Sequence, residues 1–145
     1  MCAARVSFYV LSGTEAGARL SYACRLVEKA YKLQNRIHAH AGSASMAKVL
    51  DTLLWTFRQG SFVPHEILTP DTLPTAPITI GGEGNTAPPD ADLLVNLADE
   101  VPGFFGRYAR IAEIIDGSPA CREAGRARHR FYREQGLEPE THEVS

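Results

Sequence analysis

Five arginines crowd one short stretch near the C-terminus, and guanidinium groups at this density are suited to binding an anion. The stretch runs from Ser118 to Gly136 and reads SPACREAGRARHRFYREQG. Proline directly after serine favours a helix start and glycine favours a stop, so the stretch predicts one helix. Arginine binds phosphate and carboxylate groups through forked hydrogen bonds. The arginines of this predicted anion-binding helix are Arg122, Arg126, Arg128, Arg130 and Arg133.

The predicted helix has two unlike faces, because successive residues turn by about 100°. The outward, basic face consists of Arg122, Arg126, His129, Arg130 and Arg133. The opposite face is expected to pack on the protein through Cys121, Ala124, Ala127, Phe131 and Gln135. Arg128 lies off the outward stripe and is expected to matter less for binding. A solvated charged surface is the plain alternative, but five arginines without a lysine favour forked recognition.

A glycine-rich segment in the middle of the chain matches the pattern G-x-G-x-x-A over 82–87. In dinucleotide-binding proteins this loop leads into a helix whose N-terminus holds the pyrophosphate. Here Pro88 and Pro89 follow at once, so that helix cannot begin. We therefore expect no nucleotide at this loop and no cofactor. A small enzyme or binding protein for a nucleotide or phosphate ligand remains the alternative function.

Other candidate groups for catalysis lack partners in the sequence. His38 and His40 are two residues apart on a predicted strand and share one face, but no third metal ligand stands at a useful spacing. Ser43 and Ser45 lack the G-x-S-x-G frame of a nucleophile elbow. His65 has no evident partner. We expect no catalytic residues and no metal site.

Aromatic residues form a second possible interaction surface. Trp55 ends a predicted helix, and Phe62, Val63 and Pro64 follow in the next segment. Apolar side chains at this density in a connecting segment are either buried against the domain's own core or offered to a protein partner. The sequence leaves both interpretations open.

The 145 residues predict one domain, 1–145, with a sizeable core, since 44% of the residues are hydrophobic and 22% charged. The net charge of −2 argues against general nucleic-acid affinity. No lysine or arginine lies between Arg58 and Arg107, so the acidic middle contrasts with the basic helix. Three widely spaced cysteines predict a reducing, cytoplasmic setting, and no apolar run is long enough to span a membrane.

Hydrophobic periodicity predicts alternating strands and helices. Strands are expected at 5–11, 36–41, 77–80, 92–98 and 108–115, with helices at 15–33, 45–57 and the basic stretch. Val49, Leu50, Leu53, Leu54 and Phe57 should face the core from the second helix. A strand–helix–strand–helix opening implies parallel pairing with right-handed crossovers. The predicted fold is therefore α/β: a single Rossmann-like three-layer sandwich with a mainly parallel sheet.

Several sequence blocks resemble the chi subunit family of bacterial DNA polymerase III holoenzyme. The most specific block runs from Leu50-Asp51-x-x-Leu54-Trp55 to Ser61-Phe62-Val63-Pro64-His65. The remaining blocks are Phe8-Tyr9-Val10-Leu11, Pro77-Ile78-x-Ile80, Asp92-Leu93-Leu94-Val95-Asn96-Leu97 and Phe131-Tyr132-Arg133. Their order matches the family nearly from end to end.

This resemblance implies a non-catalytic adaptor in DNA replication. Chi-like proteins bind the acidic C-terminal tail of single-stranded DNA-binding protein (SSB), which ends in Pro-Phe with a free carboxylate. They also bind the psi subunit of the clamp loader. By position, the tail site comprises Ile115, Arg122, Arg126, His129, Arg130 and Arg133, with Arg126 as the main clasp. The psi surface comprises Trp55, Phe62, Val63 and Pro64. His129 stands where the family pattern has tyrosine.

Overall fold

The computed structural model describes residues 4–15, 17–57, 63–68, 75–82, 88 and 91–144. The helices are α1 (Ala18–Lys32), α2 (Ala44–Thr56), the short 3-10 helix η1 (Phe105–Arg107) and α3 (Pro119–Glu134). The strands are β1 (Arg5–Leu11), β2 (Ile37–His40), β3 (His65–Ile67), β4 (Ile78–Gly81), β5 (Leu93–Asn96), β6 (Arg110–Ile115) and β7 (Glu140–Val144).

All described strands join one parallel sheet in the order β3-β4-β2-β5-β6-β1-β7. The predicted α/β fold with a mainly parallel sheet is confirmed, because β1 and β2 belong to the same sheet. The helices α1, α2 and α3 form the crossover connections from β1 to β2, from β2 to β3 and from β6 to β7, as parallel strands require. None of the described helices combines the length and the hydropathy that crossing a membrane requires.

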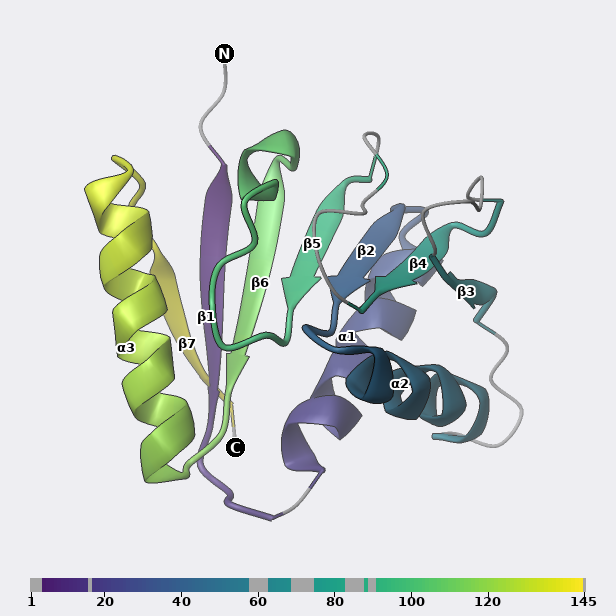
Figure 1. Ribbon diagram of the computed structural model, residues 1–145, viewed down its shortest axis with the longest axis horizontal. Helices are drawn as coiled ribbons and strands as arrows, with labels where there is room; N and C mark the ends of the chain where they lie inside the picture. Colours follow the sequence, from purple (N-terminus) through teal and green to yellow (C-terminus); the bar gives the residue numbers. More distant parts are fainter. Residues whose placement is uncertain are drawn as a thin grey trace.

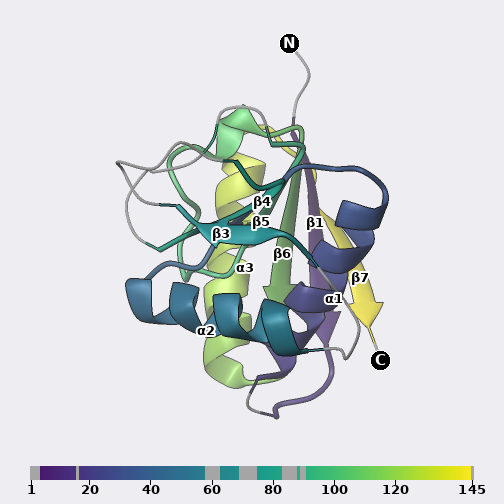
Figure 2. The ribbon, with the colours of Figure 1, turned by 90° about the vertical axis from the view of Figure 1, so that its right-hand side faces the viewer.

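The sheet separates two hydrophobic cores. On one face α1 and α2 pack over the strands through residues such as Val27, Leu50 and Leu54. On the other face α3 lies along β1 and β6, while Phe104 and Tyr108, which flank η1, cover the neighbouring strands. Figure 1 shows α3 on the side of the sheet away from α1 and α2, and Figure 2 shows α2 in front with α3 behind.

Strand β5 shows why the central strands read as continuous apolar runs. Leu93 and Val95 face the α1/α2 core, whereas Leu94 faces the α3 core. The same alternation in β6 sends Ala112 and Ile114 to one side and Ile111 and Ile115 to the other. Both faces are covered by helices or connecting segments, so both sets of side chains are buried.

Three sequence predictions need correction. β3 lies in the segment between the second predicted helix and the strand predicted at 77–80, where no strand was predicted, and β7 was not predicted either. β7 is an edge strand whose residues are mostly exposed, so its sequence ETHEV lacks an apolar alternation. Val49 does not face the core and is 46% exposed, because Ala47, Leu50 and Leu54 occupy the buried side of α2.

Candidate functional site

Helix α3 begins where the chain leaves the carboxyl end of β6. Asp116 accepts hydrogen bonds from the backbone N–H and the hydroxyl of Ser118, at 2.9 and 2.6 Å, and Pro119 opens the helix. These bonds lower the pKa of the Asp116 carboxyl against the effect of its partial burial. The turn thereby fixes where α3 starts relative to β6.

The outward face of α3 carries the predicted ridge of guanidinium groups. Arg122, Arg126, Arg130 and Arg133 are exposed, and His129 is half-buried. No ion pair joins these four arginines to any carboxylate among the described residues. Their hydrogen-bonding capacity therefore remains open to an anionic partner.

Beside this ridge lies an apolar slot of about 160 Å³. Phe8 and Val10 of β1 and Ile115 of β6 contribute its apolar surface. Arg122, Gly125, Arg126 and His129 line it from α3, and Thr141 lines it from β7. The slot thus places cationic groups at the rim of an apolar hollow, where a ligand with an aromatic ring next to a carboxylate would fit both.

Gly125 keeps the slot open. A Cβ at this position would overlap Cδ1 of Ile115 and lie 3.0 Å from its Cγ1. Only a residue without a side chain lets Ile115 lie beneath the helix in this way. His129 closes one side of the slot with its ring centroid 5.2 Å from that of Phe8.

The groove continues along α3 beyond the slot. A second, more polar hollow of about 470 Å³ is lined by Arg126, His129, Arg130, Arg133 and Glu134. Arg126 and His129 belong to both hollows. All six residues that the resemblance assigns to the tail site therefore lie along one continuous surface.

Arg128 corrects our interpretation of the helix faces. Its side chain is buried, with 3% of the residue exposed, and its Nε donates to Oε1 of Glu113 at 2.8 Å. The sheet-facing stripe consists of Gly125, Arg128 and Tyr132, while Ala127 and Gln135 are exposed. The prediction of the sheet-facing residues was wrong because a search for apolar residues does not select glycine or arginine. Here the arginine is buried because a buried carboxylate pairs with it.

Trp55 lies on the opposite side of the sheet, on α2, and is 48% exposed. Its ring packs 4.2 Å from the ring of His65, whose Nε2 lies 3.1 Å from the carbonyl and 3.2 Å from the carboxylate of Asp51. Val63 is buried in the core and Pro64 is half-buried. Phe62 lies outside the described residues, so its place on the same surface as Trp55 stays a prediction.

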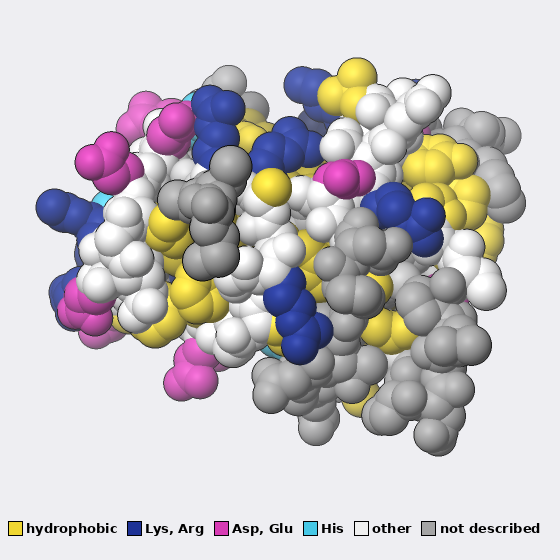
Figure 3. Space-filling view, turned by 90° about the horizontal axis from the view of Figure 1, so that it is seen from above, with side chains coloured by type: hydrophobic (Ala, Val, Ile, Leu, Met, Phe, Trp, Pro, Cys, Tyr) yellow, Lys and Arg dark blue, Asp and Glu magenta, His cyan; other side chains and the backbone are white. Residues whose placement is uncertain are grey.

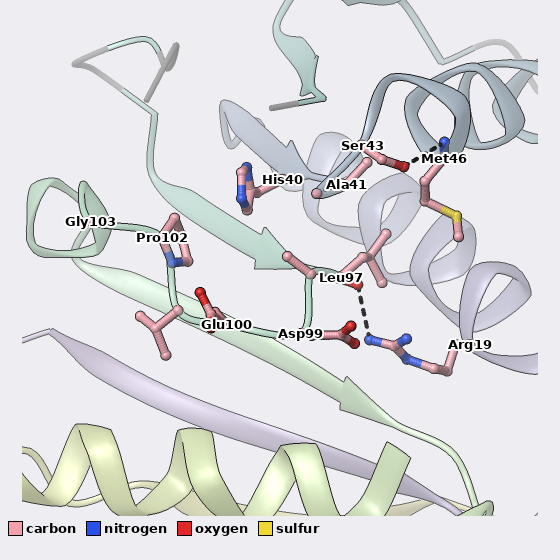
Figure 4. A pocket seen from close by; sticks show the side chains of 13 residues that line it. Arg19, His40, Ala41, Ser43, Met46, Leu97, Asp99, Glu100, Pro102 and Gly103 are labelled. Carbon is pink, nitrogen blue, oxygen red and sulfur yellow. Dashed lines mark hydrogen bonds between the residues drawn. The ribbon is translucent and has the colours of Figure 1, made fainter. Parts of the chain in front are cut away.

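A larger crevice of about 810 Å³ lies at the carboxyl ends of β2 and β5, where Rossmann-like proteins hold ligands. Figure 4 shows Arg19 directed at the carbonyl of Leu97 beside Asp99, with His40 at the other end. Exposed carboxylates of Asp99 and Glu100 line it, which disfavours a phosphate group. The glycine-rich loop itself, apart from Gly82, lies outside the described part of the chain.

His38 and His40 both face the aromatic residues around η1. Burial lowers the pKa of His38 to about 3 and also lowers that of His40. His38 Nδ1 lies 2.7 Å from Thr79 Oγ1, and its ring packs against Phe104 and Tyr108. Within the described ranges, no group of three or more His, Cys, Asp or Glu side chains is placed to hold a metal ion.

The face seen in Figure 3 carries basic side chains without a comparable ridge. Figure 3 looks onto the end where β1, β5 and β6 begin and shows basic side chains spread over that face, separated by polar and apolar ones. Arg5 at this end lies 3.5 Å from Glu140, and Arg110 donates to Asn35 at 3.0 Å. The ridge on α3 is therefore distinguished from this face by its spacing and its adjoining slot.

Sequence reasoning missed the contributions of Phe8, Val10, Gly125 and Thr141 to the slot. These residues come from three separate elements, and only their convergence in the fold gives them a shared role. Gly125 carried the one usable signal, because glycine in the middle of a helix costs stability and so indicates a packing constraint.

The sequence is similar to proteins of one family over nearly its whole length. The family described as "DNA polymerase III chi subunit, HolC" matches residues 3–140. The chain is 41% identical over 143 residues to DNA polymerase III subunit chi of Pseudomonas aeruginosa, covering 97% of this chain and 96% of the relative. Subunits of the same name from Haemophilus influenzae and Escherichia coli are 27% and 22% identical, over 94% and 90% of this chain and 95% and 92% of the relatives.

Proposed function

Since the chain belongs to the DNA polymerase III chi subunit family, we propose that it joins the acidic C-terminal tail of SSB to the clamp loader. Chi is a non-catalytic accessory subunit of the polymerase, so the alternative of a small Rossmann-like enzyme is set aside. The observation that carries the proposal is the apolar slot bordered by the arginine ridge on α3.

The tail's terminal phenylalanine occupies the slot in this proposal. Its ring packs on Phe8, Val10 and Ile115, and burying such a side chain contributes about 1.5–3 kcal/mol. The terminal carboxylate lies at the rim, where Arg122 and Arg126 offer forked donors. His129 contributes an edge of the slot, in the place where the family pattern has tyrosine.

The tail's acidic residues account for the rest of the ridge. Once the carboxyl end is in the slot, the preceding residues extend over the second hollow toward Arg130 and Arg133. Both arginines are exposed and at most one helical turn from Arg126 or His129. Their contribution is largely ionic and should therefore weaken with added salt.

Trp55 marks the surface proposed for psi or a psi-like protein. A half-exposed tryptophan on a helix, held by His65 from the next segment, is the type of anchor found at protein interfaces. Pro64 extends this surface beside the buried Val63, and Phe62 belongs to it in the proposal. Because Trp55 and α3 lie on opposite faces of the sheet, both partners can bind at once.

The proposal is tested by titrating the protein with an SSB tail peptide and with the same peptide ending in Ala instead of Phe. We expect saturable binding of the first peptide and binding at least tenfold weaker for the second, at about 1.4 kcal/mol per tenfold. Absence of binding by the Phe-ended peptide at low salt would remove the tail assignment.

A further inference from the structure

A buried polar cluster joins α3 to the sheet directly behind the docking surface. Glu113 of β6 is fully buried, and its carboxylate accepts from Arg128 Nε at 2.8 Å, from Tyr132 Oη at 2.6 Å and from Asn96 Nδ2 at 2.8 Å. Arg128 Nη1 also donates to the carbonyl of Asp99 at 3.0 Å. Three segments of the chain, β5 with its following loop, β6 and α3, thus meet at one carboxylate.

We propose that Arg128 and Glu113 are positioning residues for the docking site, because their contact sets the rotation of α3 on the sheet and with it the width of the apolar slot. This inference rests on the proposed binding of the SSB tail. Neither residue touches the bound peptide in the proposal, and both act through the residues that line the slot.

Two donors on α3 reach different oxygens of the same carboxylate. Arg128 binds Oε1 and Tyr132 binds Oε2, and the two residues are one helical turn apart. Two attachment points along the axis fix both the rotation and the axial shift of the helix. Apolar packing alone is non-directional and would tolerate several rotations.

The Glu113–Arg128 ion pair and the apolar slot lie next to each other in the interface between α3 and the sheet. Glu113 and Ile115 are two residues apart on β6 and therefore face the same side of the sheet. Gly125 and Arg128 are three residues apart on α3 and share one helix face. The Glu113–Arg128 pair therefore lies beside the Ile115–Gly125 contact in the same interface. If α3 rotates about its axis at the ion pair, the residues that line the slot are displaced as well.

The cluster is poorly suited to stability alone. Burial raises the pKa of Glu113, and the Arg128 guanidinium and three hydrogen bonds oppose that rise. Arg128 Nη2 finds no hydrogen-bond partner in the described part of the chain. Buried ion pairs of this kind often contribute little net stability compared with apolar replacements, and fixing one arrangement is a better-supported use.

The test compares fold stability with binding in a paired variant. Arg128→Met alone deprives the buried Glu113 carboxylate of its cationic partner, so both stability and tail binding should fall. Adding Glu113→Gln removes that charge, and cooperative thermal unfolding should largely return. We expect the double variant still to bind the Phe-ended peptide about tenfold more weakly than wild type, while its affinity for the Ala-ended peptide is unchanged, because only ring burial depends on the slot.

The outcomes separate the two claims. If the folded double variant distinguishes the two peptides as well as wild type does, the cluster is only structural and the inference is overturned. If wild type binds neither peptide, the proposed function fails and this inference fails with it.

A milder variant decides the question should the double variant not unfold cooperatively. Tyr132→Phe keeps the ring and removes one attachment to Glu113. We expect the ratio of the affinities for the Phe-ended and Ala-ended peptides to fall about twofold to fivefold. An unchanged ratio would count against the positioning role. Tyr31→Phe on α1, which lies on the other face of the sheet, is the matched control.

Discussion

Replacing Gly125 by alanine should close the apolar slot while leaving α3 in place. The new Cβ would overlap Cδ1 of Ile115, which is the flexible end of that side chain. Ile115 can therefore turn away, and the space into which it turns is the slot of about 160 Å³. The variant converts a hollow that fits an aromatic ring into filled apolar surface.

The effect on stability should be small because two contributions oppose each other. Alanine in place of glycine in a helix interior stabilises by about 1 kcal/mol. Overpacking against Ile115 costs about 1–3 kcal/mol. The net destabilisation should not exceed about 2 kcal/mol, a Tm decrease of less than roughly 8 °C for a domain of this size.

Binding should change far more than stability. Loss of the buried phenylalanine ring removes about 1.5–3 kcal/mol, so affinity for the Phe-ended SSB peptide should fall by roughly tenfold to a hundredfold. Affinity for the Ala-ended peptide and the dependence of binding on salt should stay as in wild type, since the arginine ridge is untouched. Calorimetric titration of both peptides at two salt concentrations measures all of these quantities.

Gly106→Ala is the matched control, because a Cβ there meets nothing within 4 Å and the glycine has no positive φ. Its peptide affinity should equal that of wild type. If Gly125→Ala binds the Phe-ended peptide with wild-type affinity, the ring does not occupy this slot and the reasoning is refuted.

Four further predictions concern the arginine ridge, Trp55, His38 and Cys24. Arg126→Ala should weaken tail binding by about tenfold or more and reduce its salt dependence, whereas Arg25→Ala on the exposed side of α1 should not; equal affinities in a peptide titration would contradict the ridge assignment. Trp55→Ala should abolish most binding to a purified psi protein with little change in Tm, with the exposed Leu33→Ala as control, and undiminished co-elution would exclude this surface. The free energy of unfolding should decrease by about 2 kcal/mol between pH 7 and pH 5, because the folded-state pKa of His38, about 3, lies below its unfolded value of about 6.5. This contribution to stability is present above pH 6.5 and is lost as the pH falls toward 3. Urea unfolding of the His38→Gln variant should show a smaller decrease over the same pH range. Burial raises the pKa of the Cys24 thiol to about 12, so Cys24 should resist alkylation in the native protein while the half-buried Cys121 reacts sooner. Peptide mass mapping after brief treatment measures both rates. Rapid labelling of Cys24 would mean that α1 opens readily.

Local sequence patterns determined the main elements of the fold. The apolar runs at β1 and β5 and the 3.6-residue period of α1 and α2 report burial, which depends on residue type and spacing alone. The start of α3 at Pro119 and its basic outer face could likewise be predicted, because proline, glycine and arginine act locally. The order of strands and helices then restricted the topology to a mainly parallel sheet.

The tertiary structure alone decided how the site is built. The slot needs Phe8, Ile115, Gly125 and Thr141 side by side, although they are far apart along the chain and no local pattern links them. The burial of Arg128 was equally hidden, since an arginine is normally solvated unless a distant carboxylate, here Glu113, meets it inside the protein. Such contacts depend on where whole elements dock, and that placement is a property of the packed sheet and helices together.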